Sequence, residues 1–311
     1  LNLNDGFTGA LTVKLTGDSG DNIVNTANIP LTVVANVADI NGDNVTSITG
    51  GVGTDTLTLT NAADGAETIL ADPDGAQDRI TGIDAINIVD ATSGADLTIT
   101  TNDYSNTNAG VPAPLTIDAS SLDSGEDLTL TGTASLTAMN VTSGGGNDGL
   151  TGGTKSDTID GGAGNDTLAG TNGNNVLTGG AGNDSITLGD GADNVSGGAG
   201  NDTIVGGSNI KLTDTIDGGD GTDTLTIAAN ISSATVMAGV SNIEVIAPAG
   251  AEDITANGSL GGATTFSLAN AGNNALTLST GWTADTTVSI AGDTGSGDSV
   301  VNSANVDLTV K

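Results

Sequence analysis

The stretch that decides the fold reads Gly161-Gly162-Ala163-Gly164-Asn165-Asp166-Thr167-Leu168-Ala169, and the same pattern, Gly-Gly-x-Gly-x-Asp-x-apolar-x, recurs from Gly179 and from Gly197. Blocks in this register open at residues 143, 152, 161, 170, 179, 188, 197 and 206, and a ninth opens at 218 after a three-residue insertion. The apolar position is aliphatic in every block: Leu150, Ile159, Leu168, Leu177, Ile186, Val195, Ile204, Ile216 and Leu225. Such a period predicts a repeat architecture whose stacked units share one core.

The first six positions of the block combine glycine with aspartate, and this combination suits calcium. Glycine reaches backbone angles that other residues avoid, so its carbonyl oxygen can turn toward a shared ion. Calcium takes six to eight oxygen ligands at about 2.3–2.6 Å in a tolerant geometry. Two stacked loops can supply main-chain carbonyls and one aspartate carboxylate each, while the x-apolar-x positions form a short strand.

Residues 143–226 resemble the calcium-binding repeats of the repeats-in-toxin (RTX) family. The resemblance covers about a quarter of the chain and implies an all-β fold, a parallel β-roll in which two nonapeptides make one turn. Blocks two apart would then stack at about 4.8 Å. The family includes secreted toxins, proteases, lipases, adhesins and bacterial S-layer proteins. Its members typically leave the cell by type I secretion and fold outside it, where calcium is millimolar.

Alternate blocks fall on opposite edges of such a roll, and the two edges differ. The odd blocks open at 143, 161, 179, 197 and 218 and carry an aspartate each; the even blocks open at 152, 170, 188 and 206 and are degenerate. The odd edge is predicted to hold about four calcium ions. Its predicted ligands are Asp148, Asp166, Asp184, Asp202 and Asp223, with Gly161, Ala163, Gly164, Gly179, Ala181, Gly182, Gly197, Ala199, Gly200, Gly218 and Gly221.

The even edge is predicted to be partly occupied or empty. Lys155 replaces a glycine, Asn175 replaces the aspartate, Leu188 replaces the first glycine, and Asn209-Ile210-Lys211 is inserted. Asp157, Asp193 and Asp214 are weaker candidates for metal ligands on this edge.

Further similarities indicate a modular chain. Residues 50–59 resemble residues 218–227, which makes Asp55 another weaker metal candidate, and a Gly-aliphatic-x-x-Ile stretch follows at Gly82 and at Gly239. The predicted organisation is a strand-rich module at 1–142, the calcium-binding roll at 143–226, a module at 227–275 that resembles 60–92, and a segment at 276–311 that resembles 1–33. The flanks alternate apolar and polar residues as short strands do, either as a β-solenoid or as β-sandwich-like segments, in an elongated molecule.

Composition excludes several functions. The 311 residues include no His and no Cys, which removes the usual ligands of zinc, haem and iron–sulfur clusters and the triad of a lipase. A net charge of -33 opposes binding to nucleic acid and to anionic membranes. The motif Gly17-Asp18-Ser19-Gly20-Asp21 is similar to a serine-protease loop but has no His to activate it. We therefore expect no catalytic residue, no organic cofactor and no enzyme activity.

The remaining resemblance is to S-layer and other surface-array proteins, which are acidic and free of Cys. It implies an extracellular structural protein at the bacterial cell surface that folds on Ca²⁺ and self-assembles as a homopolymer, in a lattice or a filament, with a cell-surface polysaccharide as a further partner. The alternatives are a calcium-stiffened repetitive adhesin and the secretion domain of a larger enzyme. Phe7 and Trp282, matched aromatic residues of the two terminal motifs, are expected in the core or in equivalent contact pockets.

Overall fold

The computed structural model describes residues 1–3, 8–15, 22–27, 29–36, 47–51, 53–60, 67–69, 80–89, 96–101, 114–133, 135, 137–211, 213–227, 239–248, 253–256, 265–267, 275–278, 286–289, 299–302 and 308–310. These residues form strands and turns and contain no helix. None of them forms a helix long and apolar enough to cross a membrane. Phe7, Trp282 and residues 17–21 lie outside the described residues.

The chain divides into two compact units, Leu1–Asn172 and Gly173–Lys311. The boundaries expected at 142/143, 226/227 and 275/276 remain predictions.

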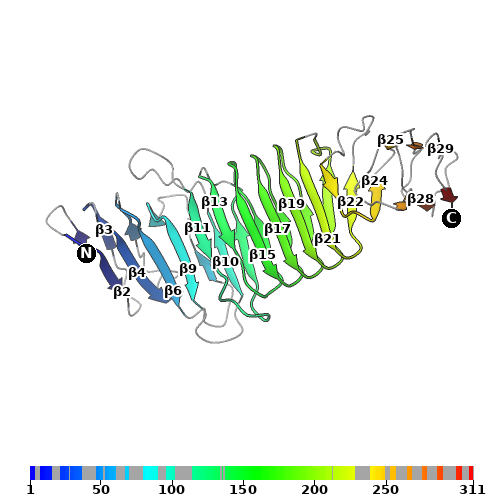
Figure 1. The fold of residues 1–311 in the computed structure, drawn as a ribbon. Helices are drawn as coiled ribbons and strands as arrows, with labels where there is room; N and C mark the ends of the chain where they lie inside the picture. The colour runs from blue at the N-terminus through cyan, green and yellow to red at the C-terminus, as the bar shows by residue number, and fades with distance from the viewer. Residues whose placement is uncertain are drawn as a thin grey trace. The chain divides into compact units, whose positions relative to one another are not determined.

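The first unit is a parallel β-solenoid with strands stacked in chain order (Figure 1). One face carries β2 (Leu11–Lys14), β4 (Leu31–Asn36), β6 (Thr56–Thr60), β9 (Ala85–Val89), β11 (Leu115–Asp118), β13 (Met139–Thr142) and β15 (Thr158–Ala163). A second sheet carries β1 (Asn2–Leu3), β3 (Asn22–Asn25), β5 (Ser47–Thr49) and β8 (Ile80–Thr81), and a third carries β7 (Glu67–Ile69), β10 (Leu97–Thr100), β12 (Leu128–Thr131), β14 (Gly149–Thr151) and β16 (Thr167–Ala169).

The core of the first unit consists of rows of aliphatic side chains, and each turn of the solenoid contributes one residue to a row. Parallel pairing places identical positions of successive strands over one another, so one row reads Val33, Leu57, Ile86, Ile117, Val141 and Ile159. A second row reads Ile99, Leu130, Leu150 and Leu168. All of these side chains are buried. Because polar residues alternate with them, each strand buries one face and leaves the other toward solvent.

The second unit has the same construction (Figure 1). Its first sheet contains β17 (Val176–Ala181), β19 (Asn194–Ala199), β21 (Thr215–Asp220) and β23 (Val240–Ser241). Its second sheet contains β18 (Ser185–Thr187), β20 (Thr203–Gly207), β22 (Thr224–Ile227), β24 (Val245–Pro248), β26 (Thr265–Ser267), β28 (Thr286–Ser289) and β30 (Leu308–Val310). Its third sheet contains β25 (Asp253–Ala256), β27 (Ala275–Leu278) and β29 (Ser299–Asn302). Phe266 lies in the aliphatic row of the second sheet, paired with Ile246 and Val288, and is fully buried.

The predicted core positions of the repeat and its turn of two blocks are confirmed. The nine aliphatic positions of the blocks are at most 1% exposed. Thr203 pairs with Ser185, eighteen residues earlier, so two nonapeptides make one turn of the solenoid. The alternative left open for the flanks is resolved as well, because the described flanking strands pair in parallel as a β-solenoid and not as sandwich-like segments.

Candidate metal centre

A row of buried aspartates follows the odd blocks, and within each unit these aspartates are hydrogen-bonded from one rung, that is, one turn of the solenoid, to the next. In the first unit the main-chain amide of Asp148 donates to Oδ1 of Asp166 at 2.8 Å. In the second unit the amides of Asp184 and Asp202 donate to Oδ1 of Asp202 and Asp223, both at 2.8 Å. The five aspartates are at most 2% exposed. The aspartate of the repeat therefore links successive turns through a hydrogen bond to one of its two carboxylate oxygens.

The second carboxylate oxygen is the unusual one. Oδ2 is buried and has no hydrogen-bond partner in Asp148, Asp193, Asp202 and Asp223. A buried acceptor without a donor is costly, and a buried charge costs far more unless a cation faces it. These oxygens therefore require either a cation or a proton.

The first glycine of a block leaves space that oxygen atoms surround. A Cβ atom added to Gly197 would lie 2.4 Å from Oδ2 of Asp202 and 2.3 Å from the carbonyl oxygen of Gly218. A Cβ atom on Gly179 would likewise lie 2.4 Å from Oδ2 of Asp184 and 2.5 Å from the Gly197 oxygen. A carboxylate of one rung and a carbonyl of the next thus converge, and no space for a side chain remains at Gly179 or Gly197.

The fourth position requires glycine for a second reason. Gly200 has φ +138°, and a Cβ there would lie 1.8 Å from the carbonyl oxygen of Gly182 in the preceding odd block. Because L side chains rarely adopt such a φ and no space exists for one, the loops can stack at strand spacing only as glycine loops.

Burial dominates the acidity of these groups. It raises the pKa of Asp202 and Asp223 above the ordinary value of 3.8, while the backbone hydrogen bond to each opposes the rise and the neighbouring acidic residues add to it. Burial likewise raises the pKa of the following residues, with hydrogen bonds opposing the rise in each: Asp55, Asp148, Asp157 and Asp193. The fold thus holds carboxylates in surroundings that disfavour their free negative charge.

The donor set fits calcium. Among the described residues, no three acidic, histidine or cysteine side chains lie together as a metal-binding group. An ion on the odd edge would therefore be held mainly by main-chain carbonyls, with one aspartate from each rung. All these donors are oxygen, which suits a hard ion with many tolerant ligand positions and not zinc or copper.

Two of the even-block aspartates are satisfied by the protein itself. Oδ1 of Asp157 accepts the amide of Met139 at 2.8 Å, and Oδ2 accepts the amide of Gly153 at 2.6 Å. Asp214 has the same arrangement, because Oδ1 accepts the amide of Asp193 at 3.0 Å and Oδ2 accepts that of Lys211 at 2.6 Å. These carboxylates have donors at both oxygens, unlike Asp202 and Asp223.

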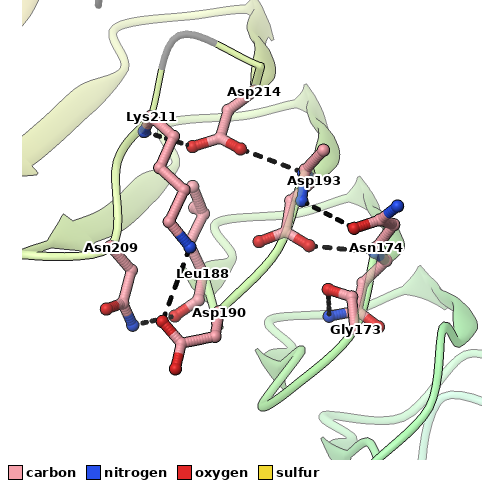
Figure 2. Close-up of polar contacts among 10 residues, drawn as sticks. Gly173, Asn174, Leu188, Asp190, Asp193, Asn209, Lys211 and Asp214 are labelled. Carbon is pink, nitrogen blue, oxygen red and sulfur yellow. Dashed lines mark hydrogen bonds and ion pairs between the residues drawn. The ribbon is translucent and has the colours of Figure 1, made fainter.

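The inserted segment places a positive charge on the even edge (Figure 2). Lys211 reaches Asp214 with its main-chain amide and Asp190 with its ammonium group, whose Nζ lies 3.5 Å from Oδ1. Asp193 lies in the adjacent even block, where Oδ1 accepts the amide of Asn175 at 2.9 Å and Oδ2 has no donor. Among the three weaker even-edge candidates, Asp193 is thus the one with an unpartnered oxygen.

Asp55 is also satisfied by the protein. Oδ1 accepts the amide of Leu31 at 2.8 Å and the side-chain amide of Asn25 at 3.1 Å, and Oδ2 accepts the amide of Gly51 at 2.6 Å. The sequence pattern places Asp55 with the odd-block aspartates, but its hydrogen bonds place it with Asp157 and Asp214.

A second polar ladder was missed by the sequence analysis. The asparagine at the fifth position of the block accepts the amide of the same position one turn later, as in Asn147 with Asn165 at 2.8 Å and Asn183 with Asn201 at 2.7 Å. The sequence contains a pattern that indicates this ladder, because Asn directly precedes Asp in one block after another. This ladder holds the outer side of the loop while the aspartate holds the inner side.

Comparison with known families agrees with this geometry. Residues 142–177, 169–204 and 213–226 match the family model described as the RTX calcium-binding nonapeptide repeat (4 copies). This segment carries RTX repeats. Calcium is the metal of such repeats, and the gap between the second and third matches contains the insertion at Asn209–Lys211. No curated protein and no solved structure matches the chain. Proteins with RTX repeats are typically secreted and extracellular, and the repeat solenoid is typically a non-catalytic structural domain.

Proposed function

We propose that this chain is an extracellular structural protein that folds on calcium and self-assembles into a surface layer or filament at the bacterial cell surface. The observation that carries the calcium part is the row of buried aspartates on the odd edge, with unpartnered oxygens at Asp148, Asp202 and Asp223. Without a cation the stacked carboxylates repel one another and the glycine-rich loops lose much backbone entropy on ordering. With calcium, the free energy of binding becomes free energy of folding.

The assignment of ions to blocks follows from the donors. We assign calcium to the odd edge, with Asp148, Asp166, Asp184, Asp202 and Asp223 as the carboxylate ligands and the glycine-loop carbonyls as the others. On the even edge we assign a weaker site at Asp193, whose Oδ2 has no donor. Asp55, Asp157 and Asp214 are proposed to be metal-free turn caps, since amide groups already occupy both oxygens of each.

Composition supports the assembly part of the proposal. The chain is acidic and free of Cys, as S-layer proteins and other surface-array proteins are. Its net charge of -33 makes assembly depend on a cation that screens or bridges like-charged copies.

The calcium part is tested by far-ultraviolet circular dichroism of the purified chain in a chelator and in millimolar calcium, with equal magnesium as the control. A gain of β signal with calcium and not with magnesium is expected. A fully folded spectrum in the chelator, with no calcium bound in equilibrium dialysis, would contradict the proposal.

The assembly part is tested by electron microscopy of the same samples. A lattice or filament that appears with calcium and dissolves in the chelator supports the structural protein. Calcium-loaded monomers that bind a glycan or a cell surface would instead favour the adhesin, and inert monomers would favour the folding domain of a larger secreted protein.

A further inference from the structure

Two glycine-rich blocks of nearly identical sequence are followed by the same kind of rung. They read Gly50-Gly-Val-Gly-Thr-Asp55 and Gly218-Gly-Asp-Gly-Thr-Asp223. The amide of Asp55 donates to Oδ2 of Asp84 at 2.7 Å, and the amide of Asp223 donates to Oε2 of Glu244 at 2.9 Å. The rung after each block therefore supplies an acidic residue where a further nonapeptide would have its aspartate.

These closing rungs lack the glycine-rich loop. Gly82 and Asn242 both have positive φ, +67° and +50°, and each is followed by a fully buried isoleucine, Ile83 or Ile243, and then by the acidic residue. In the structure Gly82 therefore corresponds to Asn242. The sequence similarity had instead aligned Gly82 with Gly239. Asn242 and Glu244 lie outside the residues that match the RTX repeat.

The two blocks differ in the oxygens of their aspartates. Both oxygens of Asp55 accept amide groups, as described above. Oδ2 of Asp223 is fully buried and has no donor. A Cβ on Gly218 would lie 2.7 Å from this oxygen and 1.9 Å from the carbonyl oxygen of Asn242, so both oxygens border the same small space.

We infer that the row of calcium sites ends on a cation site beyond the repeat, formed by Oδ2 of Asp223 and the main-chain carbonyl of Asn242, with Glu244 as its positioning residue. The inference rests on the proposed calcium function. The closing rung of the first module, at Gly82 and Asp84, holds no such ion.

Charge explains why the ion is needed at this rung. Asp223 contacts Asp202 on one side and Glu244 on the other, through hydrogen bonds between amides and carboxylates. The ion pair recorded among the described residues, Lys211 with Asp190, involves neither Asp223 nor Glu244. Two oxygen atoms that face one space with no donor between them repel unless a cation or a proton lies there. An oxygen-only donor set is suited to calcium.

Glu244 acts through the rung and not through contact with the ion. Its carboxylate accepts the Asp223 amide, while the amides of Glu244 and Val245 both donate to the Asp223 carbonyl oxygen at 3.2 and 2.9 Å. These three bonds fix the backbone of Asp223. Loss of an outer-shell partner of a metal ligand typically costs about 10–100-fold in affinity.

The test is the number of calcium ions bound per full-length chain, measured by equilibrium dialysis and by calorimetric titration. Asp223→Asn is expected to bind one ion fewer than the unaltered chain. Glu244→Gln is expected to bind the same number with one site weakened by about tenfold. Asp55→Asn and Asp84→Asn, the matched controls in the first module, are expected to leave both the number and the affinities unchanged.

The outcomes separate this inference from the proposed function. If the unaltered chain binds no calcium, the proposed function fails and the inference with it. If the chain binds calcium but Asp223→Asn keeps every ion, a proton fills the space instead: the inference and the assignment of Asp223 as a ligand are overturned, while the calcium-dependent fold is not. Loss of an ion in Asp55→Asn would overturn the inference too. Should Asp223→Asn fail to fold, the affinities of Glu244→Gln decide, and affinities equal to those of the unaltered chain would overturn it.

Discussion

The main-chain amide of Asp202 donates a 2.8 Å hydrogen bond to Oδ1 of Asp223, while Oδ2 of the same carboxylate is buried without a donor. Oδ1 of Asp223 thus links two turns of the solenoid whether or not a metal ion is bound, and Oδ2 is available to a cation. This division predicts that aspartates of the same repeat position respond to calcium in two different ways.

Asp202→Asn and Asp157→Asn are expected to show these two responses. Asp202→Asn should lower stability and affinity in calcium but not lower stability in chelator, because no donor faces its Oδ2. Asp157→Asn should cost about 1–3 kcal/mol in both conditions, since an amide group would then face the amide of Met139 or Gly153. Denaturant unfolding with and without calcium measures both, and equal calcium dependence of the two variants would contradict the assignment.

The pH dependence should change sign with calcium. Burial raises the pKa of Asp202 and Asp223 in the folded state above 3.8, so without calcium the folded state binds more protons than the unfolded state. This contribution to stability is fully present below pH 3.8 and is lost as pH rises through the raised pKa. Thermal unfolding in chelator should therefore show higher stability near pH 5 than at pH 7. In calcium, where protons compete with the ion, stability should fall on acidification.

Gly200→Ala is expected to be severely destabilising, by more than about 2 kcal/mol, with or without calcium. The added Cβ would lie 1.8 Å from the carbonyl oxygen of Gly182, at a residue with φ +138°. Gly125→Ala is the matched control, because a Cβ there meets nothing within 4 Å. Thermal unfolding of both variants checks this, and similar losses at the two positions would show that close stacking of the loops is not the cause.

Lys211→Met should have little effect on stability, less than about 1 kcal/mol. The side chains of Lys211 and Asp190 are 43% and 72% exposed, so solvent screens their ion pair. The bond from the Lys211 main-chain amide to Asp214 does not depend on the side chain and would remain. The number of bound calcium ions should also stay constant. A larger loss, or the gain of an ion, would mean that the ammonium group stands in for calcium on the even edge.

The sequence by itself determined the period, the core positions and the metal chemistry of this protein. An aliphatic residue every nine positions has to point inward if blocks two apart are to stack, and Leu168 and Ile186 do so. Repeated glycine and aspartate restrict the bound ion to one that prefers oxygen ligands. Alternation of apolar and polar residues also predicted the flanking strands, but it could not name their partners, because the same alternation suits a sandwich and a solenoid.

Only the tertiary structure decided which aspartates keep an oxygen free. Asp55 and Asp223 have the same neighbours in sequence, and in both of them the amide of another turn donates to Oδ1, from Leu31 or from Asp202. The difference lies at Oδ2, which accepts the amide of Gly51 in Asp55 and has no donor in Asp223. The two loops have different backbone conformations, because Gly219 has a φ of +103° and Gly51, the residue that matches it in sequence, does not have a positive φ. A local motif therefore specifies the carboxylate, and the conformation that its loop adopts in the stack determines whether that carboxylate needs a metal ion.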